Sequence, residues 1–309
     1  MQDNIYNEIT GKARPSLFAA SGLLLLAVLG LWAASLLASL APSGMDQDLL
    51  VNALYYLPFI GLPILLYALR RPGISEGMRM NPVSPFSMVM AAMLGLWCVY
   101  IASVCTGAWN ALLEMLGLEP FGEAEAAGSA RELTLSILTL AAIPAIFEEL
   151  LFRGFVLSAW ESRGTAFGIG VTAVFFALLH GNLFGWPAYL LVGAISGYLC
   201  YALNSIYASM AFHTVYNTAC LVITYMASKI SSDEVEASGS VVLSMVIDGI
   251  LIAGLIALML RAFELRRRMN HIEPIPRIRR PLDMKDKLML WAALAAMTVT
   301  TVLTLILGG

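Results

Sequence analysis

Long apolar segments separated by short polar loops run through the whole chain. Each is close to the ~20 residues that a helix needs to cross a bilayer core of ~30 Å. They lack the alternation of polar and apolar positions that membrane barrel strands show, and only helices or closed barrels satisfy the backbone within hydrocarbon. The pattern therefore predicts an all-α, polytopic transmembrane helical bundle of about nine spans, eight clear and one short (167–180). The eight are 16–41, 49–69, 86–108, 133–157, 187–203, 206–228, 241–260 and 288–307.

The composition excludes an ordinary soluble domain. Hydrophobic residues make up 59% of the chain, charged residues make up 13%, and the mean hydropathy is +0.79. We expect a multi-pass protein whose partner is the lipid bilayer, in a bacterial plasma membrane, and we expect no nucleic-acid partner. The first segment is too long for a signal peptide and lacks a convincing cleavage signal.

Basic residues predict the orientation of the helices. Basic loops are retained in the cytoplasm. The alternate loops hold ten acidic residues: Asp46, Asp48, Glu114, Glu119, Glu123, Glu125, Glu132, Asp233, Glu234 and Glu236. Nine spans then place the N-terminus in the cytoplasm and the C-terminus on the other side. The basic positions are Lys12 and Arg14 before the first span, Arg70, Arg71 and Arg79 after the second, Arg163 after the fourth, and a basic loop within 261–287.

One membrane domain is the simplest organisation, with three functional parts. Residues 1–132 supply N-terminal transmembrane helices, and residues 133–228 form a core that holds all the motifs described below. Residues 229–309 supply C-terminal helices and a basic, proline-containing cytoplasmic linker. The four cysteines lie in apolar spans without metal-ligand spacing, so we assign them no chemistry.

Three charged residues, Glu148, Glu149 and Arg153, lie inside the apolar span 133–157. A charge at the bilayer centre costs at least ~2.5–3.5 kcal/mol, and such residues usually face a bundle interior or a water-filled cavity. Glu149 and Arg153 are four residues apart and so are neighbours on one helix face. Glu148 lies ~100° around the helix from Glu149 and so points away from Arg153. A carboxylate without an arginine partner is suited to act as a general base. The alternative is an ion-pair cluster that holds neighbouring helices together.

Two of the three histidines, His180 and His213, also occur in apolar segments. Phe176 shares a helix face with His180, and Asn217 shares one with His213. A histidine can carry a proton, hold a metal or donate a hydrogen bond to an oxyanion, and an asparagine amide is a neutral donor. Taken singly, each histidine is more typical of an interhelical hydrogen bond worth ~0.6 kcal/mol.

The motifs E-E-x-x-x-R (148–153), F-x-x-x-H (176–180) and H-x-x-x-N (213–217) occur in this order in the spans 133–157, 167–180 and 206–228. The combination resembles the CPBP family of intramembrane proteases, which contains type II CAAX prenyl endopeptidases and bacteriocin-processing and immunity proteins. The resemblance covers residues 133–228. It implies an endopeptidase acting on membrane-associated proteins or peptides. The implied roles are water activation by Glu148 and His180, oxyanion stabilisation by His213 and Asn217, and support from Glu149, Arg153 and Phe176.

The motifs leave the cofactor open. Glu148, His180 and His213 could form a zinc site with an open position. The chain has no H-E-x-x-H or other metalloprotease spacing, however. We therefore favour a glutamic mechanism without a metal or other cofactor.

Two rival functions remain. A proton-coupled transporter would also use intramembrane Glu, His and Arg, although transporters often show two pseudo-symmetric halves, whereas all motif residues here fall within 148–217. A catalytically silent scaffold or immunity factor would keep the same fold. Asp248, outside the motifs, could belong to a cavity wall, but we expect it to be a hydrogen-bonding partner between helices.

The predicted topology also places His180 and His213 at different depths. His180 ends its short span, whereas His213 comes early in the next span but one. Equal depth would require a tilted or broken helix, and Gly181, Gly185 and Pro187 supply residues that can break one.

Overall fold

The computed structural model describes residues 14–41, 47–71, 73–119, 126–229, 239–275 and 281–307. Lys12 and the part of the basic linker at 276–280 lie outside the described residues. Every regular element in the described ranges is helical. The elements are α2 (Leu17–Ser39), α3 (Gln47–Tyr55), η1 (Tyr56–Gly61), α4 (Leu62–Leu69), α5 (Ile74–Gly77), α6 (Pro85–Met115), α7 (Ala130–Ser136), η2 (Ile137–Ala142), α8 (Ile143–Glu149), η3 (Leu150–Leu157), α9 (Ser158–Trp160), η4 (Glu161–Arg163), α10 (Thr165–Leu179), η5 (Leu183–Gly185), α11 (Trp186–Leu203), α12 (Ile206–Ala227), α13 (Gly239–Met269) and α14 (Met284–Leu307).

Eight helical stretches among the described residues are long and apolar enough to cross a membrane, and α10 is shorter but apolar. This confirms the predicted helical bundle. The fourth span is longer than predicted, extending over Ala130–Arg163. It begins early because Ser129 and Glu132 form a capping box, in which the Ser129 hydroxyl accepts from the Glu132 amide and the Glu132 carboxylate accepts from Gly128 N.

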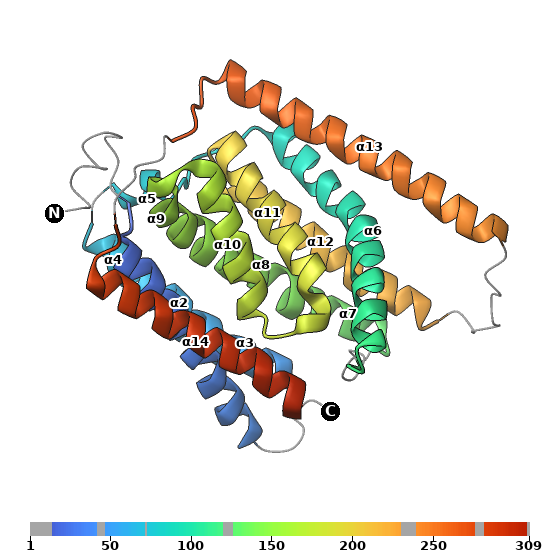
Figure 1. The fold of residues 1–309 in the computed structure, drawn as a ribbon, viewed down its shortest axis with the longest axis horizontal. Coiled ribbons are helices and arrows are strands. Elements are labelled where there is room, and N and C mark those ends of the chain that lie inside the picture. Colours follow the sequence, from blue (N-terminus) through green and yellow to red (C-terminus); the bar gives the residue numbers. More distant parts are fainter. Residues whose placement is uncertain are drawn as a thin grey trace.

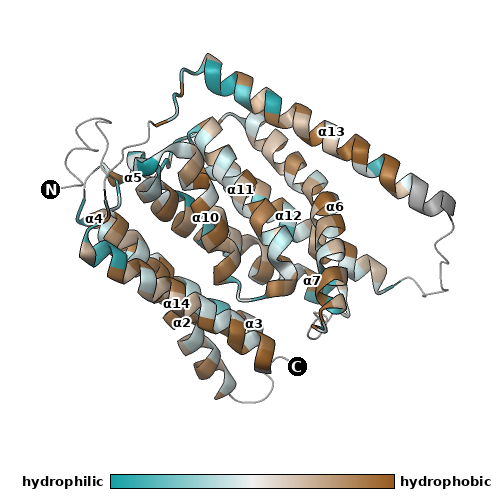
Figure 2. Cartoon of the chain, viewed as in Figure 1, coloured by the Kyte–Doolittle hydropathy of each residue, from teal (hydrophilic) through white to brown (hydrophobic). Residues whose placement is uncertain are grey.

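The helices of the central layer surround the motif residues. Figure 1 shows α8, α10, α11 and α12 in the middle, with α6 alongside α12, α2 and α14 together on one side, and α13 along the other edge. Brown, hydrophobic residues cover much of the outer helices in Figure 2, and teal residues gather around α5 and at the C-terminal end of α13. An apolar outer surface with polar ends is what a bilayer requires.

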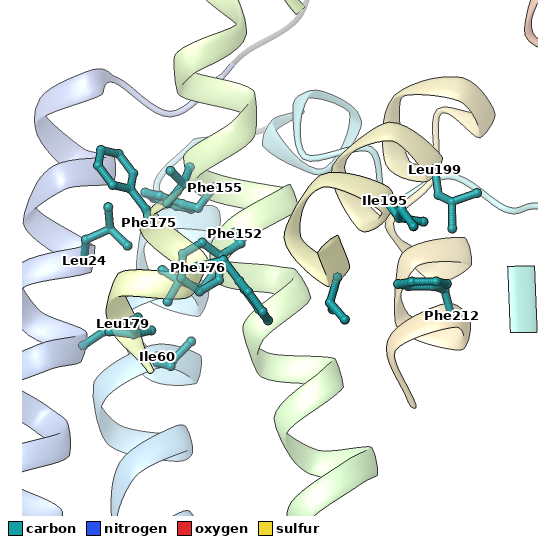
Figure 3. Close-up of a cluster of buried hydrophobic side chains, with 14 of the residues drawn as sticks. Leu24, Ile60, Phe152, Phe155, Phe175, Phe176, Leu179, Ile195, Leu199 and Phe212 are labelled. Atoms are coloured by element: carbon teal, nitrogen blue, oxygen red, sulfur yellow. The ribbon is translucent and has the colours of Figure 1, made fainter. Parts of the chain in front are cut away.

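Aromatic and aliphatic side chains fill the centre of the bundle (Figure 3). Two glycines allow the central helices to approach closely. A Cβ on Gly95 of α6 would lie 2.4 Å from the carbonyl oxygen of Phe212, and one on Gly193 of α11 would lie 2.9 Å from Cα of Ala173 in α10. Small residues at such interfaces let membrane helices pack backbone to backbone. Substituting either glycine would push apart the helices that carry the motifs.

A proline in the fourth span explains how the second span is attached to it. In the π-helical segment η2, the Ile143 amide donates to the Leu138 carbonyl, five residues back. The next residue, Pro144, has no N–H to donate to the Thr139 carbonyl. The side-chain amide of Asn52 in α3 donates to that carbonyl instead, at 3.0 Å. This bond docks α3 and η1 against η2 and α8.

A buried charge cluster joins three distant parts of the chain. Its members, Arg14, Arg79 and Glu161, are almost completely buried. Arg14 Nη1 and Arg79 Nη1 each lie 2.7 Å from Glu161 Oε2, and Arg79 Nη2 donates to Glu161 Oε1 at 2.9 Å. The interpretation of Arg14 and Arg79 as loop charges therefore missed their place in the folded protein. The orientation predicted from the basic residues stays a prediction.

Asp248 does not take the place predicted for it. Its side chain is exposed on α13, and it makes no side-chain hydrogen bond or ion pair with the described residues. The predicted interhelical hydrogen bond is therefore not found. Among the described residues the helix packs mainly along α6 and α11, and the side chain of Asp248 is exposed.

Candidate functional site

The three motifs meet around one cavity. Glu148 and Glu149 end α8, Arg153 lies in η3, His180 follows α10, and α12 carries the last motif. The cavity has a volume of about 390 Å³. It is lined by Asn52, Tyr56, Leu140, Pro144, Glu148, Phe176, His180, Ala188, Tyr189, Val192, His213, Tyr216, Asn217 and Cys220. Glu149 and Arg153 lie behind this lining.

Glu149 and Arg153 form the predicted i,i+4 pair. Arg153 Nη1 lies 2.9 Å from Glu149 Oε1, and both side chains are fully buried. Arg153 Nη2 also donates to the Gly193 carbonyl at 2.9 Å, and the guanidinium lies over the Phe176 ring, 4.9 Å from its centroid. A buried charge needs this set of partners because removing one leaves the other uncompensated. The pair therefore holds η3, α10 and α11 together behind the cavity.

The hydrogen bonds of both histidines assign their tautomers. His213 Nδ1 lies 3.0 Å from Glu149 Oε1, and His180 Nδ1 lies 2.7 Å from the Phe176 carbonyl oxygen. A carboxylate paired with arginine and a carbonyl can only accept, so each Nδ1 carries a proton. In its neutral form each histidine then presents the lone pair of Nε2.

Glu148 presents one oxygen to these two nitrogens. Its Oε2 lies 4.0 Å from Nε2 of His180 and 4.0 Å from Nε2 of His213, and it accepts no hydrogen bond from the described residues. Its Oε1 accepts a hydrogen bond from Tyr56 Oη at 2.8 Å. Glu148 thus has no arginine partner, as predicted, but it does have a hydrogen-bond donor that the sequence did not indicate.

His180 reaches the site without a break in its helix. α10 continues to Leu179, and the bond from Nδ1 to the Phe176 carbonyl turns the imidazole back by one helical turn. The Tyr189 ring stacks on it with centroids 4.0 Å apart. The predicted breakers act after His180, where Gly181 adopts a φ of +64° and Pro187 lies in the first turn of α11. The two histidines nevertheless reach the same atom, because Nε2 of each lies 4.0 Å from Glu148 Oε2.

Sequence reasoning missed the wall of the cavity that the second span supplies. Asn52 and Tyr56 line the cavity from α3 and η1. An amide side chain in the apolar span 49–69 was a signal that could have pointed to Asn52. The sequence gave no reason to select Tyr56, because it is one of two adjacent tyrosines and neither belongs to a motif.

The nitrogen and carboxylate atoms at the cavity are of the types that bind zinc. Among the described residues, no group of three or more His, Cys, Asp or Glu side chains has the arrangement to hold a metal ion. Glu148 Oε2 and the two Nε2 atoms are the donors that a zinc ion would use here, with Nδ1 protons held by acceptors as in many metal sites. A mechanism without a metal therefore stays a prediction.

Residues 130–219 match the family of Rce1-like type II CAAX prenyl endopeptidases. The matched segment runs from the start of α7 into α12 and contains all three motifs, so the resemblance to the CPBP family is confirmed over this part of the chain. No curated protein and no solved structure matches the chain. The family points to a peptide hydrolase with membrane-associated peptide substrates. The eight apolar helices agree with an integral, multi-pass membrane protein.

Proposed function

We propose that this protein is an intramembrane endopeptidase that hydrolyses membrane-associated proteins or peptides with a glutamate-activated water. One observation carries the proposal: Glu148 Oε2 and Nε2 of both His180 and His213 face one another across 4.0 Å at the cavity. An ionised carboxylate is a proton acceptor, and a general base must lie within reach of the proton it removes. The family match supports the same reaction class.

In the proposed reaction, Glu148 Oε2 removes one proton from a water molecule, and the Nε2 lone pair of His180 accepts a hydrogen bond from its other hydrogen. The water oxygen forms a bond to the carbonyl carbon of the peptide, and the carbonyl electron pair moves to its oxygen. When this tetrahedral intermediate collapses, the C–N bond breaks and protonated Glu148 gives its proton to the leaving nitrogen. The carboxylate is thereby regenerated.

The oxyanion would be stabilised by donors on α12. The Asn217 side-chain amide lies at the cavity and is a donor in any protonation state. His213 is different, because its Nε2 becomes a donor only when the ring is doubly protonated. Asn217 is therefore the primary oxyanion donor in the proposal, and His213 is a conditional one.

The proposed activity is tested by comparing membrane and secreted peptides from cells that express the wild type or Glu148→Ala. We expect a set of cleavage products to disappear in the variant, because removal of the carboxylate removes the base. Asp248→Ala is the matched control, since it removes an intramembrane carboxylate on α13, away from the cavity. Identical peptide sets from wild type and Glu148→Ala would contradict the protease and favour the transporter or the silent scaffold.

The metal-independent mechanism makes a separate prediction. Purified protein is expected to contain no stoichiometric zinc and to keep its activity after treatment with a chelator small enough to enter the cavity. The measurements are elemental analysis and reporter cleavage before and after chelation. Stoichiometric zinc, together with activity that returns only when metal is added back, would overturn the glutamic mechanism.

A further inference from the structure

Tyr56 connects the site to a helix outside the segment that matches the family. Its hydroxyl donates to Glu148 Oε1 at 2.8 Å, and the two residues are 92 positions apart. The Tyr56 side chain is buried, with the Phe147 ring stacked at 5.5 Å between centroids and the Tyr55 ring tilted at 4.8 Å. These contacts fix the ring, and with it the position of the hydroxyl.

The backbone around Tyr56 is held in place as well. Asn52, one helical turn earlier, is bonded to the Thr139 carbonyl that Pro144 leaves without an amide partner. Pro144 and Glu148 belong to the same short helix, α8. The second and fourth spans are thus joined at two points, which lie four residues apart in the second span and nine residues apart in the fourth.

The hydrogen bond makes the two oxygens of Glu148 inequivalent. A carboxylate can rotate about its last side-chain torsion, which has a broad energy profile. With Oε1 held by Tyr56, Oε2 is the oxygen that faces both histidines at 4.0 Å. We propose that Tyr56 is a positioning residue that orients the Glu148 carboxylate for proton removal. This rests on the proposed function of Glu148 as the base.

The test compares Tyr56→Phe with Tyr55→Phe. Both variants delete one buried hydroxyl from neighbouring residues, but the Tyr55 hydroxyl has no hydrogen-bond partner among the described residues. We expect kcat of Tyr56→Phe to fall by ~10- to 100-fold with little change in KM, because a hydrogen bond to a charged group is lost near the reacting atoms. Tyr55→Phe should stay close to wild type. Equal kinetics for the two variants would overturn the proposal.

An infrared measurement that does not depend on cleavage tests the role of Tyr56 independently of the proposed function. The carboxylate infrared band of Glu148, assigned by its loss in Glu148→Gln, is compared at one pH in purified wild type, Tyr55→Phe and Tyr56→Phe. Its frequency should change in Tyr56→Phe alone, because only this variant loses the hydrogen bond to Oε1. An unchanged frequency would overturn the role of Tyr56 whether or not the protein cleaves peptides. Full cleavage by Glu148→Gln would instead reject the proposed base.

Discussion

We expect Glu148→Gln to abolish cleavage of a reporter peptide while the protein still folds. The amide keeps the shape of the side chain and can still accept a hydrogen bond from Tyr56, but it cannot take a proton from water. Because Glu148 pairs with no arginine, the substitution leaves no buried cation without its partner. Turnover is measured with the purified protein in detergent, and folding is followed by thermal unfolding.

Glu149→Gln is the matched control, with the same change one residue away. Here the free energy of unfolding should fall by up to ~3–5 kcal/mol, because Arg153 is fully buried and loses its carboxylate. The cleavage activity should also decrease in part, because His213 Nδ1 loses its charged hydrogen-bond acceptor. Full activity in both variants would refute this division of roles between the two glutamates.

The second large effect is expected for Asn217→Ala. Loss of one oxyanion donor typically lowers turnover by ~100- to 1,000-fold. Binding of a labelled, uncleaved peptide should change far less, because the donor acts on charge that develops only in the transition state. Turnover of the matching cleavable peptide is measured in parallel. Thr218→Ala is the control, since it lies on the same helix next to Asn217 but does not line the cavity.

A different result would reassign Asn217. If Asn217→Ala weakens binding but cleaves bound peptide at the wild-type rate, Asn217 is a substrate contact rather than an oxyanion donor.

The sequence predicted the features of this protein that depend on neighbouring residues. Span positions follow from the local run of apolar residues, and the pairing of Glu149 with Arg153 follows from a spacing of four on a helix. The pair formed although the π-helical segment η3 begins directly after Glu149. Because the two residues are only four positions apart, their side chains still meet when the helix geometry between them changes.

Contacts between spans that are distant in the sequence could not be predicted from such local patterns. Glu149 and His213 are 64 residues apart, and no pattern within either helix indicates that they meet. The same holds for Tyr56 and Glu148. The motifs predicted that their residues form one site, but hydrophobic periodicity does not specify which atoms face one another. That information lies in the packing of helices, here set by close contacts at residues such as Gly95 and Gly193.

The interpretation of the basic residues was incomplete for a related reason. The rule for membrane orientation counts arginines by their position relative to a span and takes no account of their final partners. It therefore counted Arg14 and Arg79 without revealing that both end on one buried carboxylate. Asp248 shows the reverse error, because a polar residue in a span was assumed to face the bundle, yet α13 turns it outward.

The cluster of Arg14, Arg79 and Glu161 has a consequence for how the chain is assembled during synthesis. Glu161 leaves the ribosome 147 residues after Arg14 and 82 residues after Arg79. Until it arrives, both arginines are charges that resist entry into hydrocarbon and so hold the ends of the early helices at the membrane surface. Glu161 then lowers that resistance, because its carboxylate pairs with both guanidinium groups and leaves the three side chains with one net positive charge. The fourth span, which carries the base, is therefore also the segment that permits the first two spans to settle against it.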